Sequence, residues 1–560
     1  MGITTRSVKS SSMSPISKRV RLAAPLSCVM LGTLPAMSLA NQVKITASAD
    51  ADVIVQNVDS DSQGEGTLNT LSLKPRFNAA YQSRTFLGNF SGALTHLNRD
   101  NNDNSQSDNY AEYSYSANWL AIERLLSFQA SGGISYRNAN ASNFLVSDFL
   151  ANEQDLAKTQ TNRIASNLTM EQGDWVRASA SVSYAKVDSE QNLTAGFAGL
   201  DSTSSSARAS LRNGDEAKIL IWSVTGGYQN TERNTAAQGD FVSQDANGYL
   251  DTMLLGNWGL RLTASHESNE VSDVTGSETY VREFDSYGVG LTYRQSENRY
   301  LSVTANQSQS DLDEAGDDTF VGIDLRWAFS PRTSLDARYG RRFYGESASG
   351  ALNYNTKYLR SSLSYSEDIT NSSRLLSDPI LLGLLVCPYG DNATLTACYL
   401  PDNLDYTPQS GEQVFVINSE NFELDDNIVL RKSANGQVNY QFSRLTFGLF
   451  AQHTEEDYLD QDRFRTTMAA GINASFSVGQ HTHINASVRF ADIEQQSATF
   501  SNGNSQNTNA SFGLERQFGR YLVSSLDVSL VKKNGDLTDS YFGANYEDRR
   551  LTLGIRYTYE

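Results

Sequence analysis

The sequence predicts an all-β protein, a large antiparallel transmembrane β-barrel of about 20 to 24 strands with short periplasmic turns and long extracellular loops. Three observations support this fold class. The first 40 residues have the composition expected of an export leader, the later segments alternate apolar and polar residues, and the connections between those segments alternate between short and long. An outer-membrane barrel combines all three properties, whereas a soluble β-protein has no reason to keep the last one along 500 residues.

The first 40 residues have the composition of a secretory signal peptide. They carry five basic residues and no acidic one, followed by an apolar run from Leu22 to Leu34 and by Ser38-Leu39-Ala40. That run is too short to cross a bilayer as a helix, and small residues at −3 and −1 favour cleavage. We expect residues 1–40 to be removed after Ala40 and residues 41–560 to form the barrel, with Met13 an alternative start.

The last ten residues, Leu551 to Glu560, show the strand pattern most clearly. Apolar and aromatic residues occupy every second position, and Thr552, Gly554, Arg556 and Thr558 lie between them. Since strand side chains have a period of two, one face is apolar and the other polar. Residues 43–55 show a matching alternation at the start of the mature chain. We therefore expect the last strand to pair with the first and close the barrel, with Tyr559 on the lipid side.

The same pattern recurs as hairpins along the chain. Residues 321–329 and 335–339 alternate around the turn Ser330-Pro-Arg-Thr333, and residues 472–478 and 484–490 alternate around residues 479–482. Charged residues at the polar positions can face only the lumen. The predicted lumen-lining residues are Arg326, Arg338, Arg489, Arg556, Asp324, Asp336 and Asp527.

Connections alternate between brief turns and long polar stretches. The predicted short turns lie near residues 83–84, 122–124, 173–174, 213–215, 256–257, 330–331, 443–444 and 519–520. The predicted long loops are Asp59–Gly66, Asn98–Asp108, Asn138–Thr159, Asp188–Ser206 and Glu267–Ser277. Short turns on one side and long loops on the other are typical of barrels in the outer membrane.

Two places strain the strand pattern. Pro75 lies inside an alternating run, and because proline cannot donate to a ladder, a bulge or a strand end is expected there. Residues 367–426 form a long loop or insertion that contains Cys387 and Cys398. It either hides one strand, Gln413–Asn418, or is an excursion on one side of the barrel, folded into the lumen or solvated outside. In an oxidising compartment these two cysteines are expected to form a disulfide.

Composition excludes some classes of protein. The chain has 64 acidic and 45 basic residues, a formal net charge of −19, which argues against binding of nucleic-acid backbone. Neither His481 and His483 nor the acidic run 311–318 fits a zinc or calcium ligand pattern, and no serine lies in a nucleophile elbow. We expect no catalytic residues, no cofactor, no metal site and no enzyme activity.

Several segments resemble a known family. Val53–Asn57, Leu71–Asn78, Tyr81–Thr85, Asn427–Lys432 and Phe442–Phe447 resemble the large β-barrels associated with exosortase/PEP-CTERM and exopolysaccharide loci. The resemblance implies an outer-membrane protein of Gram-negative bacteria linked to surface polysaccharide export, with no catalytic residues to transfer.

The leading hypothesis is a porin-like passive channel or export conduit in the cell outer membrane. Its expected partners are outer-membrane lipid and lipopolysaccharide, the barrel assembly machinery and, through the resemblance, polysaccharide export components. The alternative is a structural or surface-interaction barrel with acidic extracellular loops and a blocked lumen.

Overall fold

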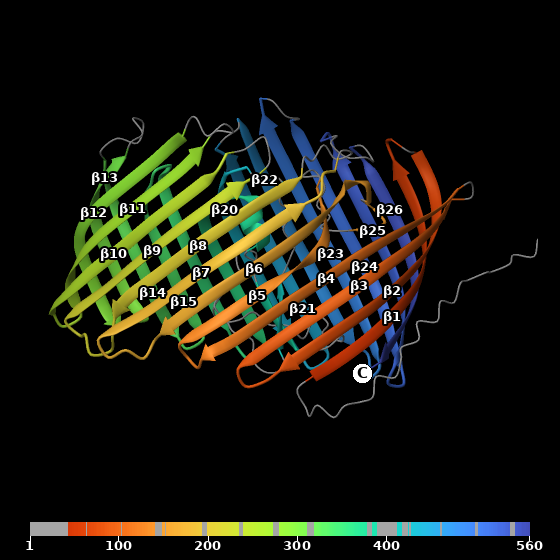
Figure 1. The fold of residues 1–560 in the computed structure, drawn as a ribbon, viewed down its shortest axis with the longest axis horizontal. Helices are drawn as coiled ribbons and strands as arrows, with labels where there is room; N and C mark the ends of the chain where they lie inside the picture. The colour runs from red at the N-terminus through yellow and green to blue at the C-terminus, as the bar shows by residue number, and fades with distance from the viewer. Residues whose placement is uncertain are drawn as a thin grey trace, which may run out of the picture. The chain divides into compact units, whose positions relative to one another are not determined.

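In the computed structural model the chain forms a closed β-barrel (Figure 1). The structure describes residues 43–559 apart from 63, 102–103, 140–147, 152, 193–198, 235–238, 273–278, 311–317, 378–383, 389–411, 417–423, 425–426, 460–461, 499–501 and 538–543. The predicted signal peptide and the Cys387–Cys398 disulfide lie outside the residues whose side chains it describes.

The barrel wall is one 24-stranded antiparallel sheet. Its first strands are β1 (Val43–Ser60), β2 (Gly64–Gln82), β3 (Phe86–Asn101), β4 (Asn104–Ile122), β5 (Leu126–Asn138), β6 (Leu156–Met170), β7 (Val176–Ser189), β8 (Leu200–Asn213) and β9 (Leu220–Arg233). The middle strands are β10 (Phe241–Leu255), β11 (Trp258–Ser272), β12 (Thr279–Ser296), β13 (Arg299–Ser310), β14 (Thr319–Ser330), β15 (Thr333–Arg342), β16 (Gly345–Asn355) and β17 (Leu359–Thr370). The last are β20 (Val429–Gln441), β21 (Leu445–Tyr458), β22 (Arg463–Ser477), β23 (Thr482–Ser497), β24 (Gly503–Phe518), β25 (Leu522–Gly535) and β26 (Tyr546–Tyr559).

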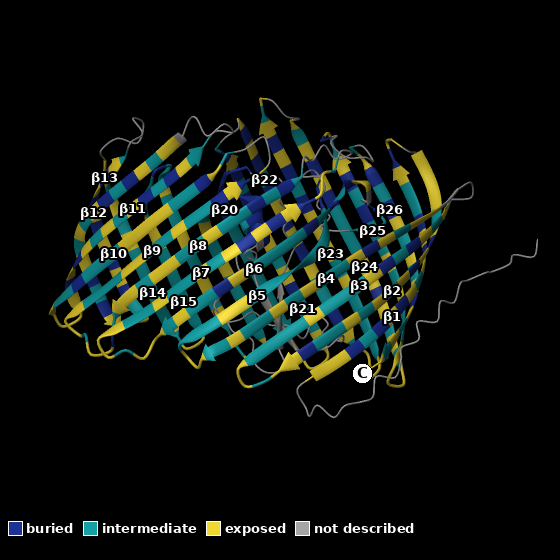
Figure 2. Ribbon diagram, viewed as in Figure 1, coloured by how far each residue is buried: buried dark blue, intermediate teal, exposed yellow. Residues whose placement is uncertain are grey.

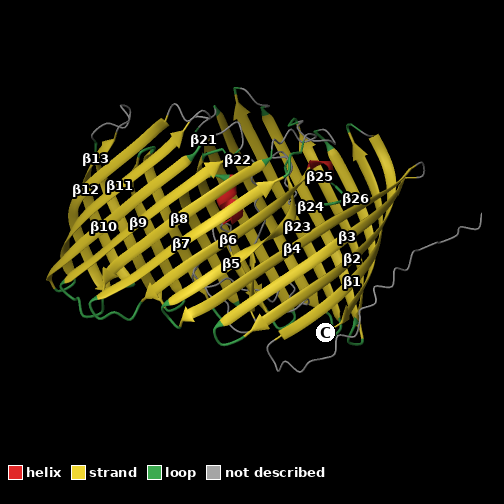
Figure 3. Cartoon of the chain, viewed as in Figure 1, coloured by secondary structure: helices red, strands yellow, loops and turns green. Residues whose placement is uncertain are grey.

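Among the described residues, four smaller elements follow the wall strands on the side with the longer connections in the sequence. They are the 3-10 helix η1 (Glu153–Asp155), the helix α1 (Ser372–Ser377), and the strands β18 (Leu384–Pro388) and β19 (Glu412–Val416). The last two pair only with each other, as a separate two-stranded sheet. Figure 3 shows α1 in red against a molecule that is otherwise almost entirely strand.

The ring closes between the first and last strands, as predicted. Strand β26 pairs antiparallel with β1, with Tyr559 opposite Ala47 and Tyr546 opposite Ser60. Since a closed sheet has no free edge, every wall strand has a neighbour on both sides, as a lipid environment requires. The count of 24 strands is even and within the predicted range.

Alternation places the apolar residues on the outside of the wall. Leu553 is 55% exposed and Tyr559 is 65% exposed, whereas Asp548 on the other face of β26 is fully buried. Figure 2 shows the resulting checkerboard of exposed and buried positions. Aromatic side chains are exposed along the rim with the short turns, where Trp119 stacks on Phe128. Tyr and Trp favour the membrane interface, so this belt marks the edge of the lipid-facing band.

The two rims differ as the sequence predicted. At the lower rim in Figure 1 the strands are joined by turns at residues 83–85, 123–125, 171–175, 214–219, 256–257, 297–298, 331–332, 356–358, 442–444, 478–481 and 519–521. These are the short periplasmic turns. The extracellular connections are longer on the whole, but two predicted long loops are mostly strand, since β1 runs to Ser60 before β2 begins at Gly64, and β3 runs to Asn101. Their polar residues alternate as regularly as apolar ones do, and pairing with neighbouring strands extends the hairpins.

The prediction of a bulge or strand end at Pro75 is wrong. Pro75 lies inside β2 and faces Ala49 of β1 in an unbroken register. Pairing with β3 lapses between Leu73 and Arg76 but resumes in the same register. The missing proline donor therefore costs ladder pairing on one side only, without displacing a residue.

The segment around residues 367–426 is an excursion on one side of the barrel. Strand β17 continues to Thr370 and pairs directly with β20, so the chain leaves and re-enters the wall at the same extracellular rim. The predicted hidden strand Gln413–Asn418 corresponds to β19, which is not part of the wall. The insertion thus adds no wall strand, and the parity of the barrel is preserved.

Candidate functional site

The inner face of the barrel gathers the charged residues of the wall. All seven predicted lumen-lining residues lie at inward positions, because each alternates with exposed outward neighbours such as Ile323, Val488, Val528 and Ile555. Register pairs Asp324 of β14 with Arg338 of β15, and Arg326 with Asp336. These residues are Arg326, Arg338, Arg489, Arg556, Asp324, Asp336 and Asp527.

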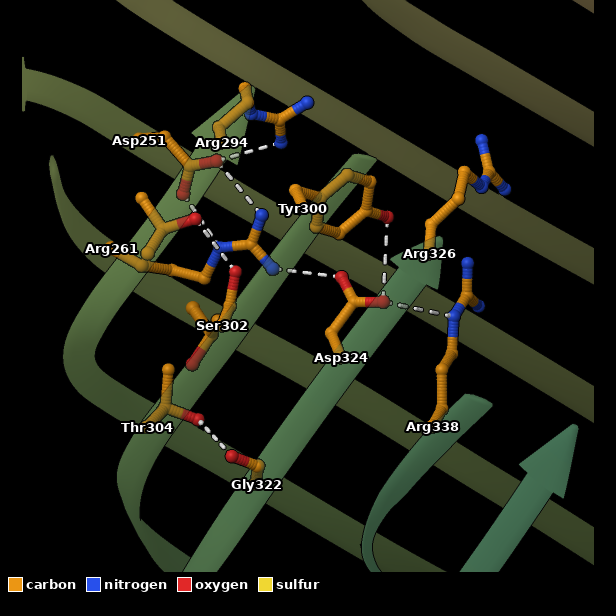
Figure 4. Close-up of polar contacts among 12 residues, drawn as sticks. Asp251, Arg261, Arg294, Tyr300, Ser302, Thr304, Gly322, Asp324, Arg326 and Arg338 are labelled. Atoms are coloured by element: carbon orange, nitrogen blue, oxygen red, sulfur yellow. Dashed lines mark hydrogen bonds and ion pairs between the residues drawn. The ribbon is translucent and has the colours of Figure 1, made fainter. Parts of the chain in front are cut away.

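A buried ion-pair network lies on the wall between β10 and β12 (Figure 4). Asp251 is completely buried, and both of its oxygens accept from Arg261, at 2.6 and 2.8 Å. Arg294 donates to the same carboxylate at 2.9 Å. A buried carboxylate is stable only when paired, and the two-pronged contact with a guanidinium is the strongest such geometry. This cluster therefore ties three neighbouring strands together inside the wall.

The network continues toward β14 and β15. Arg261 also donates to Asp324 at 2.7 Å, and its guanidinium lies 4.3 Å from the Tyr249 ring centroid. Arg338 approaches Asp324 at 3.8 Å with a side chain that is 72% exposed. The network of ion pairs thus extends from the buried Asp251 to the exposed Arg338 in the lumen.

Sequence reasoning found one end of this network and missed the other. Asp324 and Arg338 stand in an evident hairpin, so alternation identified them. Asp251, Arg261 and Arg294 also occupy inward positions in alternating strands, so the same alternation could have predicted that each of them faces the lumen. Their mutual contact depends on the register of three hairpins, which the sequence does not display.

A second group of charges lies at the closing seam. Asp50 of β1 accepts from Arg556 of β26 at 2.6 Å and lies 3.0 Å from Arg76 of β2. Beside it, a cavity of about 410 Å³ opens on the inner wall of β1–β6, lined among others by Arg76, Glu112 and Gly133. In this group the carboxylate of Asp50 offsets part of the positive charge of Arg76 and Arg556.

The start of the insertion crosses the lumen to the opposite wall. Leu375 and Leu376 of α1 are buried against inward residues of β6, β7 and β8, together with Leu424. Ser202 of β8 donates a hydrogen bond to Ser373 of α1, and both side chains are almost fully buried. Of the placements left open by the sequence, the described part of the insertion takes the lumenal one.

The turn into α1 is fixed by local hydrogen bonds. The Asn371 side chain accepts from the backbone N–H of Arg374 at 2.9 Å, the usual bond of a helix N-cap. Arg374 in turn donates to the Ile369 carbonyl at 2.8 Å and pairs with Asp368 at 3.2 Å. These contacts turn the chain inward as soon as β17 ends.

Two other extracellular segments fold inward. Asp148 pairs with Arg550 of β26 at 2.8 Å, and Phe149 stacks on Tyr110 of β4 with centroids 4.1 Å apart. Ala151 is buried among inward residues of β1, β25 and β26. Leu537, after β25, packs against inward residues of β22 and β23. The described extracellular segments therefore narrow the lumen at this end.

An apolar cluster reinforces the same end of the barrel. Phe241, Phe284, Phe343 and Ile428 are all buried in it, with Tyr344 packed at its edge. The Tyr344 hydroxyl donates to Glu367 at 2.9 Å, and burial raises the pKa of Tyr344 to about 12. The cluster joins strands from β10–β12 to the end of β17 and the start of β20.

Among the residues that the structure describes, no group of three or more His, Cys, Asp or Glu side chains could hold a metal ion. The described helices are also too short and too polar to cross a membrane. His483 contacts the Ser477 hydroxyl at 3.1 Å, and His481 lies in the preceding turn.

Comparisons with known proteins add little beyond resemblance of shape. No family model and no curated protein matches the chain. Solved structures with a similar course include the FrpB iron transporter from Neisseria meningitidis (F3-3 variant), with 10% identity, a TM-score of 0.40, and coverage of 93% of this chain and 82% of that one. The copper transporter OprC gives 10% identity, a TM-score of 0.39, and coverage of 93% and 84%. A loop L8 deletion mutant of OmpT, an outer membrane protein of Vibrio cholerae, gives 10% identity, a TM-score of 0.29, and coverage of 93% of this chain and 100% of that one. At these TM-scores the likenesses support no inference about function.

Proposed function

We propose that this protein is a passive channel of the outer membrane. One observation carries the proposal: the inner face of a closed 24-stranded ring is lined by polar and charged side chains along strand after strand. Barrels of roughly 16 to 18 strands already enclose an aqueous channel, and wider barrels carry material that fills the lumen. The inward-folded segments at the extracellular end would restrict this wide lumen to solutes of limited size, without any catalytic step.

The test is single-channel recording from the folded barrel in planar bilayers. We expect discrete current steps that appear only after insertion. As a control, the same preparation denatured and not refolded should give no steps. A barrel that is shown to be folded by its resistance to unfolding in detergent, yet never conducts, would contradict the channel hypothesis.

The cargo that we propose is a surface polysaccharide, and here the support is the family resemblance alone. Deletion of the gene should lower the amount of polysaccharide at the cell surface while the intracellular pool rises. Reintroduction of the intact chain should restore surface display. Unchanged surface polysaccharide in the deletion strain would remove the export hypothesis and leave the channel hypothesis standing.

A surface-interaction barrel with a blocked lumen is the second candidate, favoured by the packing of Asp148, Ala151, α1 and Leu537 inside the wall. Asp148→Ala removes the pair with Arg550 and the turn bonds to the Leu150 and Ala151 amides. If residues 148–155 block the lumen, this variant should conduct more than the parent barrel. Equal conductance of the two would argue against a block at this point.

A further inference from the structure

The charges of the lumen differ in sign from those of the whole protein. The chain is acidic, with a net charge of −19. On the inner wall of β7–β15, however, arginines outnumber acidic residues in the periplasmic half. These arginines are Arg177, Arg208, Arg212, Arg261, Arg294, Arg326 and Arg338, and the acidic residues beside them are Asp245, Asp251, Asp324 and Asp336.

Most of these guanidinium groups are neutralised within the wall or at its rim. Arg261 and Arg294 share Asp251, and Arg326 pairs with Asp336 at 2.6 Å. Arg177 pairs with Asp215 and, at 3.3 Å, with Glu297, both at periplasmic turns. The guanidinium groups that remain carry the exposed positive charge of this part of the wall.

That remainder, the arginine trio, consists of Arg208, Arg212 and Arg338. Arg208 and Arg212 occupy inward positions on β8, are exposed to the lumen, and have no ion-pair or hydrogen-bond partner among the described residues. Arg338 lies 3.8 Å from Asp324, which also pairs with Arg261, and the Arg338 side chain is 72% exposed.

The neighbours of Arg208 and Arg212 do not cancel their charge. Arg212 lies directly opposite Arg177 in the register of β7 and β8, and the carboxylates of Asp215 and Glu297 pair with Arg177 and not with Arg212. Arg208 lies opposite Gly227, and the side chain of Asp245 leans over that glycine without reaching ion-pair distance of Arg208. The wall therefore carries exposed positive charge on β8 and again on β15.

We propose that the arginine trio makes the lumen selective for anions and provides docking points for solutes that carry carboxylate or phosphate groups. Low-dielectric walls focus the field of such charges into an aqueous lumen. Guanidinium groups also match the planar, two-oxygen geometry of carboxylate and phosphate. The proposal deepens the channel function and rests on it, since it concerns what the same lumen passes.

The experiment measures the reversal potential of the reconstituted full-length mature barrel across a gradient of KCl. We expect a potential with the sign of chloride preference, and a preference that weakens at high salt because screening shortens the range of the field. The double variant Arg208→Glu/Arg212→Glu should lower the chloride-to-potassium permeability ratio from above one to below one. The control variant Arg444→Glu/Arg520→Glu, the same change in charge at periplasmic turns away from β8 and β15, should leave the ratio unchanged.

The outcomes separate this inference from the function on which it rests. A folded barrel without conductance counts against the channel itself. A conducting barrel that prefers potassium, or whose preference is the same in the double variant and the parent, overturns the anion selectivity alone. Arg338→Gln provides a second variant that should reduce the ratio by less, so the inference stays testable if the double variant does not fold.

Discussion

At the scale of single residues, the strongest constraint is the burial of charge in the wall. Asp251 is fully buried and serves two arginines at once. Such a carboxylate gains its stability from its partners, and its removal leaves Arg294 buried without its carboxylate and Arg261 with Asp324 alone. Asp336 makes a contact of the same length with Arg326, but its side chain is 44% exposed. The two aspartates therefore form a matched pair that differs in burial.

We predict that Asp251→Asn destabilises the folded barrel by about 3 to 5 kcal/mol, the usual cost of breaking a buried pair. Asp336→Asn should cost no more than about 1 kcal/mol, as exposed pairs do. Urea unfolding of both variants in lipid vesicles measures the difference in free energy. Equal losses would show that the wall around Asp251 is wetter than the structure indicates.

At the scale of one element, β26 shows how alternation assigns two environments to one strand. Leu551, Leu553 and Ile555 are exposed on the outer face, whereas Thr552 between them lies on the inner face. The pairing on both sides is regular, with β1 and with β25, so the assignment does not change along the strand.

This difference predicts opposite responses to one substitution. Leu553→Arg places a charge in lipid and should cost about 2 to 4 kcal/mol near the middle of the bilayer. Thr552→Arg places the same charge in the lumen and should be close to neutral. Folding yield into vesicles, followed by urea titration, distinguishes them. Equal tolerance of the two would contradict the orientation of the closing strand.

At the scale of the whole molecule, contacts across the lumen join wall strands that are distant along the ring. The insertion leaves β17 and meets β8 through Ser373 and Ser202. It buries Leu375 and Leu376 there, so the opposite walls are joined by packing as well as by hydrogen bonding. The wide ring is thus braced near its extracellular end.

A cross-link tests this brace. In a background with Cys387 and Cys398 replaced by Ser, the pair Ser202→Cys/Ser373→Cys should form a disulfide on mild oxidation. The control pair Ser206→Cys/Ser373→Cys has its wall cysteine about 13 Å further along the same face of β8 and should not. Mobility on non-reducing gels reports the result. Equal cross-linking of both pairs would mean that α1 does not hold the position described here.

The sequence by itself determined the environment of each strand face. Side-chain alternation in residues 43–55 and 551–559 was enough to predict the first and last strands, their pairing and the closed ring, since a period of two leaves only two faces. The same reasoning placed Asp324, Arg338 and Arg556 in the lumen. It misplaced loop boundaries at residues 59–66 and 98–108, because alternation of polar residues carries no apolar signal although it pairs equally well.

Only the tertiary structure decided which charges meet and what enters the lumen. The Asp251 network requires the register of several hairpins, and the crossing of α1 to β8 requires the position of walls that are more than 160 residues apart in sequence. That Arg208 and Arg212 have no ion-pair partner among the described residues also follows only from the tertiary structure. A pattern of period two specifies the direction of a side chain, whereas its partners depend on how 24 strands are aligned around the ring.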